Sequence, residues 1–288
     1  MLLGDLVRHA AERFDSVGIE SASADAELLA GHILGLSRGG VQAQILIGAT
    51  LDEKQADALT HLYARRLSRE PLQHITGVAY FRQLELSVGK GVFVPRPETE
   101  FVAQLAIDAI KDAVTAGTTN PIAVDLGTGS GAIALAMATE NQNAKIFAVE
   151  KSPEAFVFTR ANFDKYAAKC HATLIQGDLI DAFEDLNGKV SVVASNPPYI
   201  PLAAVPRDEE VRLHDPALAL YGGEDGMSVM RHVSATARRL LVDGGVLVVE
   251  HADSQSEQVC QLLLADGWRE VRAHRDLTDR DRAVTAIK

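Results

Sequence analysis

From about residue 97 onward, the sequence alternates between short apolar segments and helix-like segments. This alternation limits the possible folds more than any other feature. Helical patterns lie between several of the apolar segments, as at residues 132–140. Alternation of this kind predicts an α/β fold, with helices covering a doubly wound parallel sheet. The strand-like segments are residues 122–126, 145–150, 172–176, 190–195 and 245–251.

The end of the chain breaks this alternation. Residues 268–275 and 282–288 both resemble strands, and only a short charged loop joins them. Consecutive strands without a crossover helix pair as antiparallel neighbours. We therefore expect a mostly parallel sheet of seven strands, in which the last two run antiparallel to each other.

The first third of the chain has helical periodicity and little strand signal until Pro71. Ser23 is a plausible N-cap of the second helix, and Gly39-Gly40 is expected to end that helix. Glycine-separated β-like runs follow Pro71 and indicate a hairpin. The predicted parts are a helical domain at residues 1–74, a linker β-hairpin at 75–95 and the α/β domain at 96–288.

Composition excludes several classes of protein. With 288 residues, 47% hydrophobic and 23% charged, the chain can bury a large core. Its net charge of -11 argues against a surface built to hold nucleic-acid phosphates. No apolar run is long enough to span a bilayer, and Cys170 and Cys260 form neither a CxxC nor a metal motif. We expect a cytoplasmic protein without a bound metal or a membrane partner.

A glycine-rich turn follows the first strand of the α/β part, in the order Asp125-Leu126-Gly127-Thr128-Gly129-Ser130-Gly131. Glycines at alternate positions allow a sharp turn and a close approach to a ligand. Glu150 ends the next strand, about 20 residues later, where an acid can accept hydrogen bonds from both hydroxyls of a ribose. A purely structural turn is the alternative.

The spacing of the glycines differs from the G-x-G-x-x-G of dinucleotide sites. It resembles the first motif of class I S-adenosylmethionine-dependent methyltransferases. This resemblance implies that the loop, with Asp125 and Thr128, contacts the methionine part of the cofactor, and that Glu150 holds the ribose. It also places Asp178 beside the adenine, although an N-cap role for Asp178 is an equal alternative when the residue is taken alone.

Asn196-Pro197-Pro198-Tyr199 follows the apolar segment 190–195 directly. Two prolines end a strand and leave a stiff, extended turn. The turn is either a simple strand stop or a rigid mount for Asn196. Ligands of doubly wound sheets bind beyond the carboxyl ends of the strands, so Asn196 is expected beside the cofactor.

The same tetrapeptide resembles the signature of methyltransferases that act on planar nitrogens, either amino groups of bases or the amide of glutamine. Such nitrogens are poor nucleophiles because their lone pair is delocalised. If the side-chain carbonyl of Asn196 and the backbone carbonyl of Pro197 each accept an N–H, the lone pair is directed at the methyl group. Pro198 keeps the acceptors rigid, and Tyr199 offers a π face to the substrate.

The flanking sequence distinguishes the two substrates. Residues 69–77, 94–100, 215–226 and 275–277, with Phe81 and Glu250-His251, closely resemble protein-(glutamine-N5) methyltransferases that act on peptide chain release factors. This resemblance covers essentially the whole chain. It implies methylation of the glutamine in the Gly-Gly-Gln loop of class I release factors, as part of translation termination, with a helical domain that helps to dock that substrate.

The resemblance also places Thr99 and Glu100 near the methionine end of the cofactor. A stiff linker followed by a helix cap is a serious alternative for Pro95-Arg96-Pro97-Glu98-Thr99-Glu100. Tyr80 and Asp215 stand where the family often has other residues, which affects substrate contacts more than the reaction. His251 is expected to be a core histidine held by a hydrogen bond, and the loop 200–225 is either a substrate-facing wall or a solvated connection.

Two other functions share part of this pattern. An adenine-N6 DNA methyltransferase would carry the same Asn196-Pro197-Pro198-Tyr199, but it needs a basic groove that the acidic composition does not supply. A regulatory protein that binds the cofactor without turnover is the second alternative, and the intact Asn196 and Pro197 argue against it. We expect a monomeric enzyme.

Overall fold

The computed structural model describes residues 1–206 and 208–288. Contacts divide the described chain into two compact units, which we call the helical unit and the sheet unit. The helical unit comprises Met1–Gly77 with residues 208–214, and the sheet unit comprises Val78–Pro206 and Asp215–Lys288. This division assigns the β-hairpin to the sheet unit and part of the loop 200–225 to the helical unit. Residue 207 of that loop lies outside the described residues.

The helical unit has its own apolar core, to which Phe14, Leu29 and Leu59 contribute fully buried side chains. A capping box at Asp52 and Gln55 begins its longest helix, because each residue satisfies a backbone N–H of the other. Its helices are α1 (Leu3–Ser16), α2 (Ala22–Leu34), α3 (Arg38–Leu46), α4 (Glu53–Leu67), α5 (Leu72–Thr76) and α9 (Glu209–His214).

Two expectations for the second helix were wrong. Helix α2 begins at Ala22, so the N-cap position is Ser21 and not Ser23. The helix ends at Gly35, whose left-handed backbone (φ 66°) stops it before Gly39-Gly40. These two glycines lie inside α3, whose N-cap Ser37 accepts a hydrogen bond from the Gly40 N–H. The cap outweighs the low helix propensity of glycine at this helix start.

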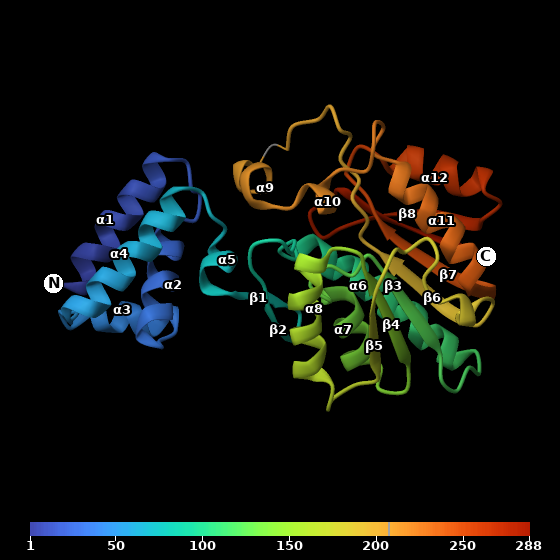
Figure 1. Ribbon diagram of the computed structural model, residues 1–288, viewed down its shortest axis with the longest axis horizontal. Coiled ribbons are helices and arrows are strands. Elements are labelled where there is room, and N and C mark those ends of the chain that lie inside the picture. The colour runs from blue at the N-terminus through green and yellow to red at the C-terminus, as the bar shows by residue number, and fades with distance from the viewer. Residues whose placement is uncertain (207) are drawn as a thin grey trace. The chain divides into compact units, whose positions relative to one another are not determined.

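The sheet unit contains the predicted doubly wound sheet, and its fold class is confirmed. Seven strands lie in the order β5-β4-β3-β6-β7-β9-β8 (Figure 1). The first five in this order are parallel, whereas β9 is antiparallel to both β7 and β8. Their bounds are β3 (Ile122–Leu126), β4 (Lys145–Glu150), β5 (Ala172–Gln176), β6 (Val190–Ser195), β7 (Leu241–Glu250), β8 (Arg269–Arg275) and β9 (Asp281–Ile287).

Helices cover both faces of this sheet (Figure 1). Alternate strand residues enter different cores: Ala123 packs with α6, α7 and α8, and Val124 packs with α11 and α12. This period of two follows from the side chains of a strand, which point alternately to the two faces of the sheet, and here both faces are buried. The helices are α6 (Pro97–Thr115), α7 (Ala132–Glu140), α8 (Pro153–Tyr166), α10 (Ala217–Leu220), α11 (Ser228–Leu240) and α12 (Ser256–Ala265), with a 3-10 turn at Glu184–Leu186.

Strand β7 is longer than predicted, because it begins at Leu241 and not at residue 245. Gly244 and Gly245 belong to the strand because both hydrogen-bond to the backbone of Lys288. These backbone hydrogen bonds stabilise the first part of the strand despite the low β propensity of glycine.

The predicted hairpin is formed by β1 (Val78–Phe81) and β2 (Leu84–Ser87), which pair antiparallel. It rests on α8: Asn162 accepts the Ser87 N–H at 2.7 Å and donates to the Ser87 carbonyl at 3.0 Å. Asn162 is completely buried and also donates to the carbonyl of Ser130. One side chain thus joins the hairpin to the glycine-rich turn.

Candidate active site

The glycine-rich turn joins β3 to α7, as predicted. Gly127, Gly129 and Gly131 have left-handed φ values of 73°, 57° and 88°, which side chains with a Cβ adopt only with strain. The N–H groups of Gly127 and Thr128 donate to the Val149 carbonyl at 3.1 and 3.0 Å. The turn is therefore held against the end of the neighbouring strand β4.

The three glycines differ in what surrounds them. A Cβ at Gly131 would lie 2.9 Å from the ring of Phe163, so this glycine permits close packing inside the protein. A Cβ at Gly127 or Gly129 would meet no described protein atom within 4 Å. The absence of side chains at these two positions therefore leaves open space above the turn, which suits a ligand that approaches the backbone closely.

Asp125 organises the turn from below. Its Oδ2 accepts hydrogen bonds from the Thr128 hydroxyl at 2.6 Å and from the Ala134 N–H at 3.1 Å. Burial raises its pKa to about 7, against the effect of these hydrogen bonds. Its Oδ1 is buried and has no hydrogen-bond partner among the described residues. An acceptor without a partner at this place fits a site for a polar or cationic ligand group.

Glu150 lies at the end of β4, beside the same turn. Its Oε2 accepts the Gly129 N–H at 2.8 Å and its Oε1 accepts the Ser152 N–H at 2.7 Å. Burial raises its pKa above the usual value. Each carboxylate oxygen has two lone pairs, so both retain acceptor capacity for the hydroxyls of a ribose.

Asp178 lies beyond the end of β5. It forms an ion pair with Lys151, the residue after Glu150, at 2.7 Å, and this hydrogen bond lowers its pKa. Its other oxygen accepts the Ile180 N–H at 3.1 Å. No helix begins at this point, so Asp178 stabilises a turn and does not cap a helix.

Asn196 follows β6, whose last residue Ser195 donates to the Leu126 carbonyl at 2.6 Å. This bond ties the end of β6 to the end of β3. The Asn196 side-chain amide donates to the Thr99 hydroxyl at 3.3 Å. Because the Nδ2 group is engaged in this way, the carbonyl Oδ1 points elsewhere and remains an acceptor.

A second network holds the backbone after Pro197. The Ile200 N–H donates to the Leu220 carbonyl, and the Gly222 N–H donates to the Ile200 carbonyl, both at 2.9 Å. A Cβ at Gly222 would lie 2.5 Å from the carbonyl oxygen of Pro198, so only glycine fits. The segment 217–226 therefore clamps the Asn-Pro-Pro-Tyr turn, a role that the sequence did not reveal.

Tyr199 lies beside a further acidic residue of the site, Glu250. Its pKa is raised by burial and by the negative charge of Glu250, which ends β7. Burial raises the pKa of Glu250 to about 7, while hydrogen bonds from Thr99 and Tyr199 and the charge of Arg282 oppose that rise. The sequence reasoning assigned Glu250 no role, although its place at the end of the strand beside β6 was a usable signal.

The residues of the Pro-Arg-Pro-Glu-Thr-Glu segment do not all face the same way. Thr99 is buried beside Asn196. Glu100 instead accepts the Arg82 N–H at 2.9 Å and so contacts the turn of the hairpin. Arg96 forms an ion pair of 2.9 Å with the buried carboxylate of Asp215, which precedes the clamp. His251 is fully buried, and its Nδ1 bonds to the Ala252 carbonyl at 2.7 Å, as expected of a core histidine.

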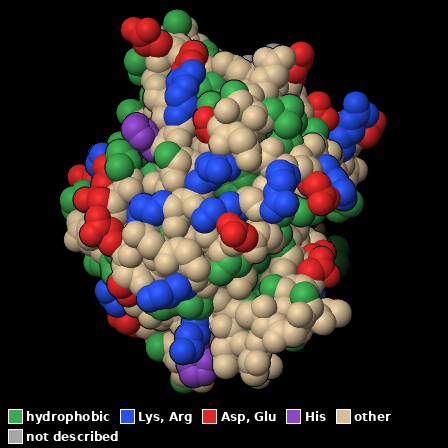
Figure 2. All heavy atoms as spheres, turned by 90° about the vertical axis from the view of Figure 1, so that its right-hand side faces the viewer, with side chains coloured by type: hydrophobic (Ala, Val, Ile, Leu, Met, Phe, Trp, Pro, Cys, Tyr) green, Lys and Arg blue, Asp and Glu red, His purple; other side chains and the backbone are tan. Residues whose placement is uncertain are grey.

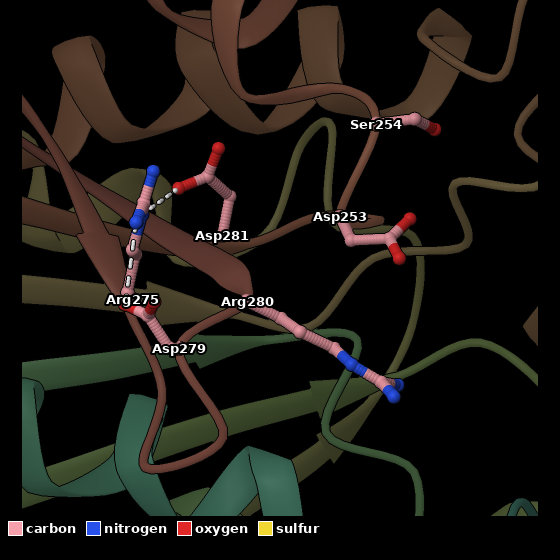
Figure 3. A pocket seen from close by; sticks show the side chains of 6 residues that line it. All are labelled: Asp253, Ser254, Arg275, Asp279, Arg280 and Asp281. Carbon is pink, nitrogen blue, oxygen red and sulfur yellow. Dashed lines mark hydrogen bonds and ion pairs between the residues drawn. The ribbon is translucent and has the colours of Figure 1, made fainter.

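A separate cavity of about 410 Å³ lies where the β8–β9 loop meets the segment after β7 (Figure 3). Its lining is polar and includes none of the cofactor residues predicted above. Arg275 spans part of it, with ion pairs of 3.2 Å to Asp279 and to Asp281. The lining residues are Asp253, Ser254, Arg275, Asp279, Arg280 and Asp281.

The chain is similar in sequence to known protein families. Residues 5–77 match the model of the PrmC N-terminal domain, and residues 86–208 match that of the methyltransferase small domain. The chain is 47% identical to a release factor glutamine methyltransferase of Streptomyces coelicolor, over 98% of this chain and 96% of that protein. The chain belongs to the release factor glutamine methyltransferase family.

Other relatives show the range of this family and its fold. A 4-amino-L-phenylalanine/4-methylamino-L-phenylalanine methyltransferase of Streptomyces pristinaespiralis is 38% identical, over 93% of this chain and 88% of that protein. The solved structure of a methyltransferase from Pyrococcus furiosus is similar to this chain with a TM-score of 0.50 and 18% sequence identity. The match covers 80% of this chain and 98% of that one. This likeness shows that the chain shares the fold of that methyltransferase.

Two features are absent from the described residues, a metal-binding group and a membrane-spanning helix. Within residues 1–206 and 208–288, no three His, Cys, Asp or Glu side chains are grouped so as to hold a metal ion. In the same residues, no helix is both long and apolar enough to cross a membrane.

Proposed function

We propose that this methyltransferase transfers a methyl group to the side-chain amide nitrogen of the glutamine in the Gly-Gly-Gln loop of class I peptide chain release factors. The observation that carries the proposal is the Asn196 amide, held by Thr99 with its carbonyl left as an acceptor beside the glycine-rich turn. Family membership over nearly the whole chain supports the choice of substrate.

S-adenosyl-L-methionine is the proposed methyl donor, and it supplies an electrophilic methyl group on a sulfonium. The residues present fit it. Gly127, Gly129 and Gly131, with Asp125 and Thr128, would line the methionine part, and the unpartnered Asp125 Oδ1 offers an acceptor. Glu150 would hold the ribose, and Asp178 the adenine. Thr99 contacts Asn196, which stands between this group and the substrate.

The chain contributes orientation to the reaction. The Asn196 side-chain carbonyl and the Pro197 backbone carbonyl each accept one N–H of the substrate amide, which turns the nitrogen lone pair toward the methyl group. Pro198 and the clamp at residues 217–226 keep these acceptors in place before the substrate binds. Tyr199 packs its ring against the planar amide. The amide proton is lost after the nitrogen has become cationic.

Three rival functions have different support. A small aromatic amine is a specific alternative, because the relative from Streptomyces pristinaespiralis bears the name of an enzyme for such a substrate. DNA adenine is less favoured: Lys and Arg gather across the face in Figure 2, but Asp and Glu lie beside them, and the net charge is -11. A regulatory protein that binds the cofactor without turnover is also less favoured, because it would not need an oriented Asn196 amide.

A direct assay separates these functions. The protein is incubated with radiolabelled S-adenosylmethionine and, in turn, a class I release factor, duplex DNA and 4-aminophenylalanine. We expect label in the release factor, and mass spectrometry should locate one added methyl group on the glutamine of its Gly-Gly-Gln loop. Label only in DNA or only in the amino acid would contradict the proposal.

We expect a monomeric enzyme of the cytoplasm, where translation termination takes place.

The variant Asn196→Ala tests the mechanism. It removes an acceptor that acts mainly on the reacting amide. The rate of methyl transfer should therefore fall about 100-fold or more, as for other preorganised hydrogen bonds. Affinity for S-adenosylmethionine, measured by calorimetry, should stay within about threefold. Transfer at the wild-type rate would refute this role of Asn196.

A further inference from the structure

Glu250 is an acid in the site that the proposed mechanism leaves unused. It is 2% exposed, and its Oε2 has no hydrogen-bond partner among the described residues. Strands β6 and β7 are parallel neighbours, with Ser195 opposite Val249. The next residues, Asn196 after β6 and Glu250 at the end of β7, therefore lie side by side at the edge where the substrate is proposed to bind.

Thr99 connects these two residues. Its hydroxyl accepts the Asn196 Nδ2–H at 3.3 Å. The same hydroxyl lies close enough to the Glu250 carboxylate to donate to it, which lowers the pKa of that acid. A hydroxyl has one proton and two lone pairs, so once the proton is committed to Glu250, Thr99 can only accept from Asn196. The acid thus selects which end of the Asn196 amide meets Thr99.

We propose that Glu250 is a positioning residue, which acts through the Thr99 hydroxyl to turn the carbonyl of Asn196 toward the methyl-accepting nitrogen. This inference rests on the proposed function of the site. Without the acid, the Thr99 proton is free to point at Asn196, and the amide can rotate to present its NH₂ group to the substrate. Two NH₂ groups would then face each other, and the substrate nitrogen would lose one acceptor.

The charged and titratable groups around Glu250 come from several elements. Tyr199 and Arg282 face it, and Glu98 on α6 repels it; Arg282 is itself held by Asp276 at 3.1 Å. Burial raises the Glu250 pKa to about 7. The protonated acid can donate to Thr99, which frees the hydroxyl proton to turn toward Asn196, whereas the carboxylate can only accept that proton. Methyl transfer should therefore rise with pH through about 7.

The first experiment compares Glu250→Ala and Glu250→Gln in the full-length protein, with a release factor as substrate. Glu250→Ala should lower kcat about tenfold or more, while affinity for S-adenosylmethionine stays within about threefold. Glu250→Gln keeps a neutral oxygen for Thr99, so it should retain most of the kcat at pH 7 but show a smaller rise of kcat with pH. Glu257→Ala, which changes an exposed glutamate on α12, is the matched control and should behave as wild type.

The second experiment is a double-mutant cycle. If Glu250 acts through Asn196, adding Glu250→Ala to Asn196→Ala should reduce kcat no further, so the two effects are strongly non-additive. A merely structural role of Glu250 would lower kcat by the same factor in both backgrounds. Cofactor binding by each variant, measured by calorimetry, shows that it has folded.

The outcomes separate this inference from the proposed function. A wild-type enzyme without activity on release factors would contradict the proposed function itself. With an active wild type, an unchanged kcat in Glu250→Ala, an additive cycle or an unchanged pH profile in Glu250→Gln would each overturn the role of Glu250. Loss of cofactor affinity in parallel with kcat would also overturn it, because Glu250 would then shape the cofactor site.

Discussion

At the scale of single residues, the glycine-rich turn requires glycine at positions 129 and 131 for different physical reasons. Both have positive φ, but a Cβ at Gly129 would enter open space, whereas one at Gly131 would meet Phe163 at 2.9 Å. Gly129→Ala should therefore cost about 1–2 kcal/mol of unfolding free energy, from backbone strain alone. Its affinity for S-adenosylmethionine should fall about tenfold or more, because the new methyl group takes the space of the ligand.

Gly131→Ala is the matched variant. It should lose about 1–3 kcal/mol more stability than Gly129→Ala, because the ring of Phe163 must move in a closely packed core. Urea denaturation gives the stabilities and calorimetry the affinities. Normal cofactor binding by Gly129→Ala would show that the ligand does not lie above this turn.

At the scale of elements, the turn after β6 depends on the segment 217–226, which is distant from it in sequence. A Cβ at Gly222 would lie 2.5 Å from the backbone oxygens of both Pro198 and Gly226, neither of which can give way alone. Gly222→Ala should displace the acceptors for the substrate amide. We expect kcat to fall roughly 100-fold, as a 1 Å misplacement can cause, with cofactor affinity nearly unchanged.

Gly244→Ala is the control for this substitution. Gly244 also belongs to the sheet unit, but it lies in the first part of β7, away from the strand end at Glu250. A Cβ there meets no described atom within 4 Å, and its positive φ (83°) predicts a stability loss of about 1–2 kcal/mol with normal kcat. If steady-state assays gave equal kcat for the two variants, the clamp would not position the Asn-Pro-Pro-Tyr turn.

At the scale of the whole molecule, a buried arginine links parts of the chain 144 positions apart. Arg66 is 3% exposed and donates to Asp25 at 2.7 Å and to Glu210 on α9 at 2.6 Å. Arg66→Met should reduce the unfolding free energy by about 3–5 kcal/mol, because it leaves the buried carboxylate of Asp25 without its cation and removes the shorter of the two ion pairs of Glu210. Urea denaturation measures this, and limited proteolysis should show faster cleavage near α9.

An exposed ion pair on the same helix provides the comparison. Arg212 and Glu209 pair at 3.2 Å with side chains that are 47% and 44% exposed. Arg212→Ala should therefore change stability by about 1 kcal/mol or less. Equal stability of Arg66→Met and Arg212→Ala would mean that the buried network does not hold α9.

Local pattern was enough to predict most of the sheet unit. Residues 122–126, 145–150 and 190–195 are strands as expected, and the glycine-rich turn leads into a helix at residues 132–140. These elements are determined by the period of their apolar residues, which each segment carries by itself. Gly39-Gly40 was misread because the start of α3 depends on a cap from Ser37, whose effect exceeds that of glycine propensity.

The fold class, the glycine-rich turn and the Asn-Pro-Pro-Tyr segment could be recognised from the sequence, because each depends on residues adjacent in the chain. The contacts that hold this segment are visible only in the folded protein. Thr99 on α6 contacts Asn196, Gly222 packs against Pro198, and Glu250 at the end of β7 lies beside Thr99 and Tyr199. Glu100, in contrast, contacts the hairpin. Such contacts arise when a parallel sheet gathers the ends of distant strands at one edge, and no local period records them.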